Sequence, residues 1–283
     1  MVIVKIIGGL GNQMFQYAYA KSLQLKGHTV KLDITEFESY LLHGGYQLNH
    51  YTIDIEIAST EEIRIFKNIF SKIGKKLKID RKSIIEKSLL FNKKYLSVNN
   101  NYIEGYFQSE FYFIEHRKII KEQFQIKSSL SRFTEKIIKE IEKLDSSCSI
   151  HIRRGDYISN NKAKNIHGSC SLDYYENAIK FLNEKGIDGQ YFIFSDDIAW
   201  VKENLKVENA IYIDSEEKRI PHEDIYLMSL CTYNIIANSS FSWWGAWLNS
   251  NPNKIVIAPK RWFLDELKEK ESMDIIPYSW VRI

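Results

Sequence analysis

The chain has 283 residues, of which 44% are hydrophobic and 27% are charged, and its formal net charge is +3. This composition is ordinary for a globular protein and allows one large domain or two modest ones. Because 39 basic residues are nearly balanced by 36 acidic ones, charge gives no reason to expect a nucleic-acid partner.

The cysteines and the N-terminus suggest where the protein works. Cys148, Cys170 and Cys231 are odd in number and widely spaced, which argues against a disulfide scaffold or a zinc site. The first apolar run is too short for a signal peptide and is interrupted by Lys5. No run approaches the roughly 18 apolar residues of a membrane span. We therefore expect a cytoplasmic protein.

The first elements predict an α/β layer. Val2–Ile7 is predicted to be a buried strand that is broken by the glycines of GGLG. Met14–Lys26 is predicted to be a helix that ends at Gly27, and Thr29–Asp33 to be a second strand. This order of strand, helix and strand is typical of a parallel sheet.

The next part of the chain is less regular. Phe37–Asn101 carries helical patterns rich in Lys and Ile. Its basic stretch Lys67–Lys94 is predicted to be a solvated helical region, or alternatively a contact with anionic lipid or an anionic acceptor. A strand and a turn at Gly105 should follow. Ser131–Leu144 has the apolar spacing of an amphipathic helix.

Short apolar strands alternate with helices in the second half. The predicted strands are Cys148–Ile152, Tyr191–Phe194, Ile211–Ile213, Asn234–Ala237 and Ile255–Ala258, and the predicted helices are Ser171–Lys185, Ile198–Leu205 and Asp224–Leu230. This alternation predicts a doubly wound parallel sheet. We expect two Rossmann-like domains, residues 1–144 and 145–283, because one α/β unit ends near Leu144 and another begins.

Four polar clusters follow predicted strands: Gly8–Gln13, His151–Asp156, Ser195–Asp197 and Asn238–Ser242. In a parallel sheet, ligands bind beyond the carboxyl ends of the strands. The sequence therefore predicts that the binding site is built from these clusters.

The first cluster, GGLGNQ, partly fits a dinucleotide-binding loop, and Asp33 lies where a ribose-binding acid would. The third glycine of that motif is replaced by Met14, which disfavours NAD or FAD. A tight strand-to-helix turn would account for the glycines but not for Asn12 and Gln13.

The second cluster, HIRRGD, favours an anion. His151 and Arg153 share one face if the strand continues, and Arg154 begins a loop that turns at Gly155. Two adjacent guanidiniums suit a diphosphate, because arginine offers bidentate donors and stays charged. Asp156 could hold an arginine or act on a hydroxyl. The alternatives are a surface salt-bridge cluster and, from Arg-Gly-Asp, an adhesion loop.

The other two clusters also have two interpretations each. Ser195 or an aspartate of FIFSDD could contact a ribose or base, or Asp196 or Asp197 could cap the next helix. Asn238–Ser242 precedes a tryptophan-rich helix, and hydroxyls with free N–H groups at a helix start bind anions. We expect the tryptophans to pack in the core and favour this over a role as a stacking surface for a ligand.

Metal chemistry has little support in the sequence. The chain contains no D-x-D triplet and no HExxH motif. We expect no metal cofactor, so arginines and helix N-termini would have to neutralise a bound diphosphate.

Several segments resemble glycosyltransferase family 11, the α-1,2-fucosyltransferases. They are GGLGNQMFQYA at 8–18, GYFQSE at 105–110, HIRRGDY at 151–157, FSDD at 194–197, DIYLMSLC at 224–231 and IIANSSFSWWGAWLN at 235–249. The resemblance covers nearly the whole chain and is weakest at about 55–100. It implies a GT-B-like α/β fold, with two Rossmann-like domains whose parallel sheets face a cleft. The N-terminal domain would hold the acceptor and the C-terminal domain the donor.

The resemblance also implies an activity, which is inverting, metal-independent transfer of L-fucose from GDP-β-L-fucose to the 2-hydroxyl of a terminal galactose. Arg153 would bind the diphosphate with help from Arg154, and His151 and Asp156 would shape the loop. The remaining donor contacts would come from Gly11, Asn12, Gln13, Ser195, Asp196, Asn238, Ser239, Ser240 and Ser242.

The sequence leaves several alternatives open. The general base could be Asp156, Glu223, Asp224 or His151, or the reaction could need little base assistance. Another linkage or acceptor, including protein O-fucosylation, and a non-catalytic carbohydrate-binding protein are the rival functions. A bacterial surface polysaccharide or lipid-linked acceptor would allow peripheral contact with the inner face of the cytoplasmic membrane. The oligomeric state is not predicted.

Overall fold

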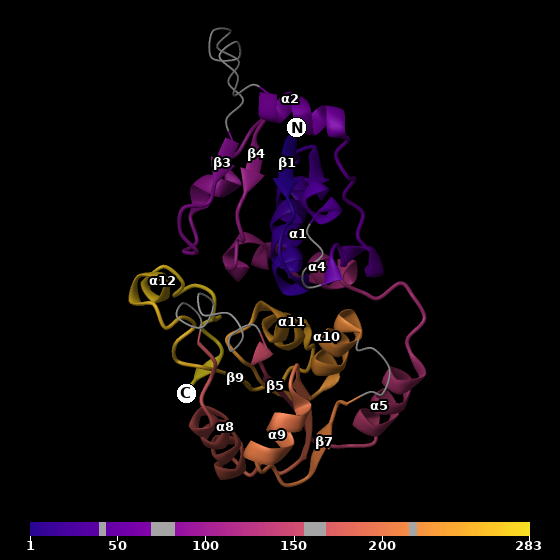
Figure 1. The fold of residues 1–283 in the computed structure, drawn as a ribbon, viewed down its shortest axis with the longest axis vertical. Coiled ribbons are helices and arrows are strands. Elements are labelled where there is room, and N and C mark those ends of the chain that lie inside the picture. Colours follow the sequence, from indigo (N-terminus) through magenta and orange to yellow (C-terminus); the bar gives the residue numbers. More distant parts are fainter. Residues whose placement is uncertain (40–43, 69–82, 156–167, 215–219) are drawn as a thin grey trace. The chain divides into compact units, whose positions relative to one another are not determined.

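A computed structural model describes residues 1–39, 44–68, 83–155, 168–214 and 220–283. The chain forms two compact units (Figure 1). Unit 1 comprises Met1–Ser128 and Met273–Ile275, and unit 2 comprises Ser129–Ser272 and Ile276–Ile283. Each contains a sheet whose paired strands are all parallel, so the predicted α/β class with two parallel sheets is confirmed.

Among the described residues, unit 1 has four strands in the order β2-β1-β4-β3. They are β1 (Val2–Lys5), β2 (Val30–Asp33), β3 (Ser83–Ile85) and β4 (Tyr102–Glu104). The helices of this unit are α1 (Leu10–Leu25), α2 (Thr60–Asn68), α4 (Arg117–Gln123) and the short 3-10 helices η1 (Thr35–Glu38), η3 (Leu48–His50), η4 (Lys93–Leu96), η5 (Glu110–Tyr112) and η6 (Ile114–His116).

Helix α1 begins earlier than the sequence predicts, at Leu10 instead of Met14. Gly8 has a φ of +78°, which turns the chain sharply after β1 and lets the helix start at once. From Leu10 to Leu23 nearly every side chain is buried, and a helix that is buried all round lies inside its domain.

The basic stretch is not one continuous helix. Residues 69–82 lie outside the described part of the chain, and the remainder contains β3 and η4. The predicted helical region is therefore wrong for residues 83–92.

Unit 2 contains six described strands in the order β10-β9-β8-β5-β6-β7. They are β5 (Ser147–Ile152), β6 (Gln190–Ser195), β7 (Ala210–Tyr212), β8 (Tyr233–Ile235), β9 (Val256–Ala258) and β10 (Val281–Arg282). Its helices are α5 (Arg132–Glu142), α8 (Leu172–Glu184), α9 (Ile198–Asn204), α10 (Pro221–Leu230), α11 (Ser240–Leu248) and α12 (Glu266–Lys270). The five strands predicted for the second half are confirmed within two residues at each end, and β10 was not predicted.

The tryptophans of α11 belong to the core of unit 2. Trp243, Trp244 and Trp247 have no exposed surface, which confirms core packing. Helices α10 and α11 lie side by side, and a Cβ on Gly245 would come within 2.7 Å of Met228 Cβ (Figure 1). Glycine at position 245 therefore permits this close approach.

Helix α5 packs on α10 and belongs to unit 2, so the division falls before α5 instead of after Leu144. Glu223 of α10 explains this difference. Its carboxylate accepts hydrogen bonds from Ser131 N at 2.9 Å, Ser131 Oγ at 2.6 Å and Thr134 Oγ1 at 2.6 Å. Burial alone would raise the pKa of Glu223, but these bonds outweigh it and place the pKa below its ordinary value.

We expect Glu223→Gln to lower the free energy of unfolding by about 1–3 kcal/mol at pH 7, because an amide cannot accept all three bonds. Since the folded-state pKa is lowered, the stabilisation is present above the unfolded-state pKa and is lost as the pH falls through the folded one. Urea unfolding at pH 7 and at pH 3.5 should therefore show the difference shrinking in acid.

The control for this measurement is Glu140→Gln, which removes an exposed ion pair with Lys143 on α5 and should change stability little at either pH. A Glu223→Gln deficit that stays constant with pH would contradict the assignment.

Candidate functional site

The strand order of unit 2 defines a topological switch point between β5 and β8. The chain runs from β5 to β6 and β7 on one side of the sheet, then starts again at β8 and runs to β9 and β10 on the other. In doubly wound sheets, ligands bind outside the carboxyl ends of the strands at this point. His151–Gly155 leaves β5 there, and Asn238–Ser242 follows β8. Two of the four predicted clusters therefore meet at the switch point.

The turn after β5 is held by Asp196. Strands β5 and β6 pair with Ile152 opposite Ser195, so Arg153 and Asp196 leave the sheet as neighbours. Asp196 Oδ2 lies 2.8 Å from Arg153 Nη1, and the same carboxylate accepts hydrogen bonds from Arg154 N at 2.9 Å and Gly155 N at 3.0 Å. Asp196 thus fixes both the backbone of the turn and the first guanidinium.

Arg154 has different partners. Its guanidinium lies 3.3 Å from the centre of the Trp200 ring, and its Nε lies 3.3 Å from Asp197 Oδ2. Asp197 Oδ1 also accepts from Trp200 N at 3.2 Å and caps α9, which confirms the helix-cap interpretation for Asp197. Trp200 was not identified from the sequence, although it lies three residues after the predicted cap. The help of Arg154 in diphosphate binding stays a prediction.

Ser195 supports the same corner of the site. It is 1% exposed, and its hydroxyl accepts from Asp197 N at 3.0 Å. A nucleoside contact for Ser195 and Asp196 stays a prediction, whereas both visibly shape the loop.

His151 is a buried residue near the end of β5, two residues before Arg153. It is 4% exposed, its ring centre is 5.5 Å from that of Phe241, and its carbonyl accepts from the Tyr175 hydroxyl at 3.2 Å. These contacts support its predicted part in shaping the loop. Asp156 lies outside the described residues.

Asn238 braces the loop after β8. Its Nδ2 donates to the carbonyls of Gly168 at 3.0 Å and Trp262 at 3.1 Å, and its Oδ1 accepts from Cys170 Sγ at 3.5 Å. Both amide hydrogens are thereby used within the protein. The geometry favours a bracing role, and the direct donor contact inferred from sequence stays a prediction.

The serines of this cluster begin α11. Ser239 Oγ accepts from Phe241 N at 3.3 Å as the helix cap, and Ser242 Oγ donates to the Ser239 carbonyl at 3.4 Å. Ser240 is the first residue of the helix and is half-buried. The N-terminus of α11 at the switch point suits an anionic ligand, because N–H groups and the helix dipole both favour negative charge there.

In unit 1, Gln13 is also a bracing residue. It has no exposed surface, its Nε2 donates to Gly8 O at 2.9 Å and Gly45 O at 2.8 Å, and its Oε1 accepts from Gln47 N at 2.9 Å. Asn12 is half-buried, and its Oδ1 accepts from Gln108 Nε2 at 2.7 Å. Gly11 is buried. Donor contacts from Gly11, Asn12 and Gln13 stay predictions.

Asp33 does not fit a ribose-binding acid. It has no exposed surface and accepts hydrogen bonds from the Tyr102 hydroxyl at 2.5 Å and from the Thr35 hydroxyl at 2.7 Å. Met14, which replaces the third glycine, is fully buried as well. Both observations argue against NAD or FAD.

Two alternatives from the sequence lose support. The Glu223 carboxylate is occupied by hydrogen bonds from Ser131 and Thr134, which argues against Glu223 as the general base. Asp224 is only 7% exposed, which argues against Asp224 in the same role.

The adhesion loop is the other alternative. It needs an exposed arginine, but Arg154 is packed on Trp200.

No helix in residues 1–39, 44–68, 83–155, 168–214 and 220–283 is long and apolar enough to cross a bilayer. No group of three or more His, Cys, Asp or Glu side chains in those ranges is arranged to hold a metal ion. That the reaction needs no metal stays a prediction.

Comparison with known proteins adds the chemical class. The family model described as Glycosyl transferase family 11 matches residues 1–283. An α-1,2-colitosyltransferase of Escherichia coli is 40% identical, covering 100% of this chain and 99% of the relative. The O-antigen biosynthesis glycosyltransferase WbnK of Escherichia coli is 35% identical, covering 98% of both. Among solved structures, the NodZ α-1,6-fucosyltransferase soaked with GDP-fucose gives a TM-score of 0.46 at 14% identity, covering 87% of this chain and 91% of that one.

Proposed function

The chain belongs to glycosyl transferase family 11, and from this we propose that it transfers L-fucose from GDP-β-L-fucose to the 2-hydroxyl of a terminal galactose. In general terms, without naming the sugar, it is a glycosyltransferase that transfers a 6-deoxyhexose to a glycan acceptor. The proposal further includes inversion at the transferred carbon and independence from metal.

The observation that carries this proposal is the position of Arg153 at the switch point, directly after β5, which pairs with the strand β8 that leads into α11. In the transfer, the bond between the sugar and the diphosphate breaks and negative charge collects on GDP. Preorganised cations and N–H groups aimed at that charge lower the barrier. Arg153 and the start of α11 supply both kinds of donor.

We assign the donor to unit 2, which contains the predicted donor domain 145–283, and the acceptor to unit 1. The switch point with Arg153 lies in the later part of the chain, which supports the first assignment. A relative is named for O-antigen biosynthesis, which supports a bacterial surface polysaccharide or its lipid-linked precursor as the acceptor. An enzyme acting on such a precursor would work in the cytoplasm, at times against the inner face of the membrane.

Colitose is the second candidate for the transferred sugar, because the 40% identical relative is named for it. Colitose differs from fucose by the absence of the 3-hydroxyl. A site that hydrogen-bonds this hydroxyl would discriminate strongly against the sugar that lacks it.

The test offers the purified chain GDP-L-fucose or GDP-colitose with a β-galactoside such as lactose, and measures released GDP. We expect GDP release to require the acceptor, to survive EDTA, and to give an α-1,2 linkage by NMR of the product. A preference for GDP-colitose would move the donor to the second candidate. Another linkage would overturn the proposed acceptor position, and no GDP release with any β-galactoside would favour a protein acceptor or a carbohydrate-binding role.

A further inference from the structure

Glu86 lies at the carboxyl edge of the unit 1 sheet, directly after β3. Its N–H donates to the carbonyl of Glu104 on β4 at 2.8 Å. Ile85 pairs with Glu104, and neighbouring residues of a strand alternate between the two faces of the sheet. The Glu104 side chain shares its face with Lys5, whereas Glu86 points to the other face.

The Glu86 carboxylate holds the turn that follows β4. Its Oε2 accepts from Tyr106 N at 2.7 Å and from Phe107 N at 3.1 Å. A Cβ on Gly105 would come within 2.5 Å of Glu86 Cβ, so only glycine allows the carboxylate so close. Phe107 has a φ of +51°, a conformation that is unusual for a side chain of this size. The Glu86 carboxylate therefore accepts a hydrogen bond from Phe107, whose left-handed backbone conformation is unfavourable on its own.

Glu86 is surrounded by aromatic residues. The Phe107 ring is stacked 3.9 Å from that of Tyr19, and Tyr95 and Tyr112 pack on the same ring. These three tyrosines are the titratable groups that α1, η4 and η5 place around Glu86. Burial raises the pKa of Glu86 to about 7, although the two N–H groups act in the opposite direction. Within the described part of the chain, its Oε1 is buried without a hydrogen-bond partner.

The same turn is connected to the GGLGNQ loop by two amide side chains. Gln108 Nε2 donates to Asn12 Oδ1 at 2.7 Å. Gln16 Nε2 donates to the Gly105 carbonyl at 3.0 Å, and Gln16 Oε1 accepts from Ile7 N at 2.9 Å. A displacement of the turn at Gly105 would thus reach both ends of the glycine loop.

We propose that Glu86 is a positioning residue for the reaction, which fixes the Gly105–Phe107 turn and through Gln108 sets the place of Asn12. We do not assign it as the general base, because its unbonded oxygen is buried. The inference rests on the proposed function only in linking the turn to transfer.

The experiment compares Glu86→Gln with Glu86→Ala in the full chain. Glutamine keeps one acceptor oxygen and mimics the neutral carboxyl, so it should retain kcat/KM within about threefold. Alanine leaves both N–H groups without their acceptor and should lower kcat/KM at least tenfold. Hydrogen exchange followed by mass spectrometry should show faster exchange in the peptide that contains Tyr106 and Phe107 for the alanine variant alone.

Glu104→Ala is the matched control, since it removes a carboxylate of the same edge on the opposite face and should leave exchange at the turn unchanged. A glutamine variant as inactive as alanine would make Glu86 a reacting group and overturn the proposal. So would full activity of Glu86→Ala. Unchanged exchange at the turn in that variant would also overturn it. If the wild-type chain transfers no sugar, the proposed function fails, while the exchange measurement still reports on the turn.

Discussion

Replacing Arg153 with alanine should lower kcat/KM for sugar transfer by about 10²–10³-fold, the loss that follows removal of one preorganised donor to a developing charge. Arg153 is the residue at the switch point whose guanidinium is fixed by an ion pair with Asp196. Its side chain is 27% exposed, so truncation should cost the fold little. Steady-state kinetics with circular dichroism would check both parts of this expectation.

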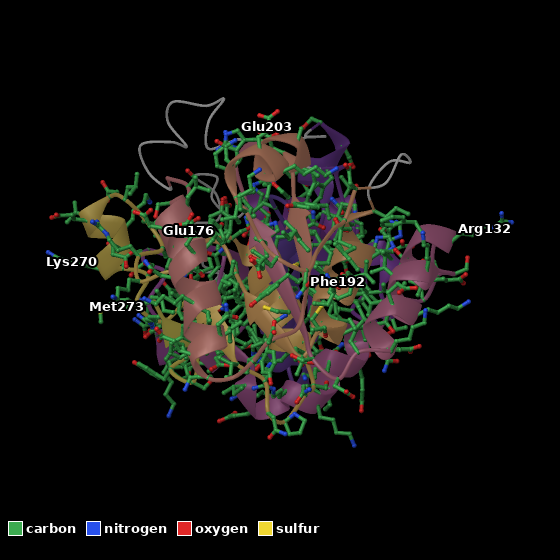
Figure 2. All side chains as sticks on the ribbon, turned by 90° about the horizontal axis from the view of Figure 1, so that it is seen from below. Arg132, Glu176, Phe192, Glu203, Lys270 and Met273 are labelled. Carbon is green, nitrogen blue, oxygen red and sulfur yellow. The ribbon has the colours of Figure 1, made fainter. Side chains whose placement is uncertain are left out.

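Two further variants sharpen the Arg153 test. Arg153→Lys keeps the positive charge but loses the bidentate geometry, and should recover only part of the activity. Arg132→Ala removes an arginine that points outward at the start of α5, at the edge of unit 2, and should keep full activity (Figure 2). Near-normal turnover of Arg153→Ala would exclude the proposed role.

Replacing Asp196 with alanine should lower kcat by about 10–100-fold, because a small displacement of positioned groups costs up to this much. The change removes the acceptor for Arg154 N and Gly155 N as well as the partner of the Arg153 guanidinium. Loss of the ion pair also frees the charge of Arg153 for phosphate. We therefore expect GDP affinity, measured by calorimetry, to change less than tenfold while kcat falls.

Asp214→Asn is the control for this prediction, because Asp214 forms an exposed ion pair with Lys202 elsewhere in unit 2. It should leave both kcat and GDP affinity unchanged. A normal kcat for Asp196→Ala would show that the turn after β5 does not need this carboxylate. A loss confined to GDP affinity would instead support the nucleoside contact inferred from sequence.

Much of the fold could be predicted because it depends on local pattern. The buried strands of unit 2 are short apolar runs, and Phe192 within β6 lies inside the layers of helices (Figure 2). The polar residues after β5, β6 and β8 had to meet at one edge once the strands were parallel. Boundaries were less certain, since the early start of α1 depends on the backbone of Gly8.

The partners of the site residues could not be predicted, since they come from register and packing. Asp196 lies beside Arg153 because β5 pairs with β6 at Ile152 and Ser195, and nothing near either residue fixes that register. The same holds for Trp200, which covers Arg154 only because α9 packs where it does.

By itself, the sequence determined the α/β class and the arginine pair at a strand end, because both follow from the order of residues along the chain. Only the tertiary structure decided which polar residues brace the fold. Gln13, Asn238 and Glu223 look equally available in the sequence, yet each is buried and uses its polar atoms on neighbouring segments. The reason is physical: a buried amide or carboxylate must be satisfied by groups that the fold brings to it from distant parts of the chain.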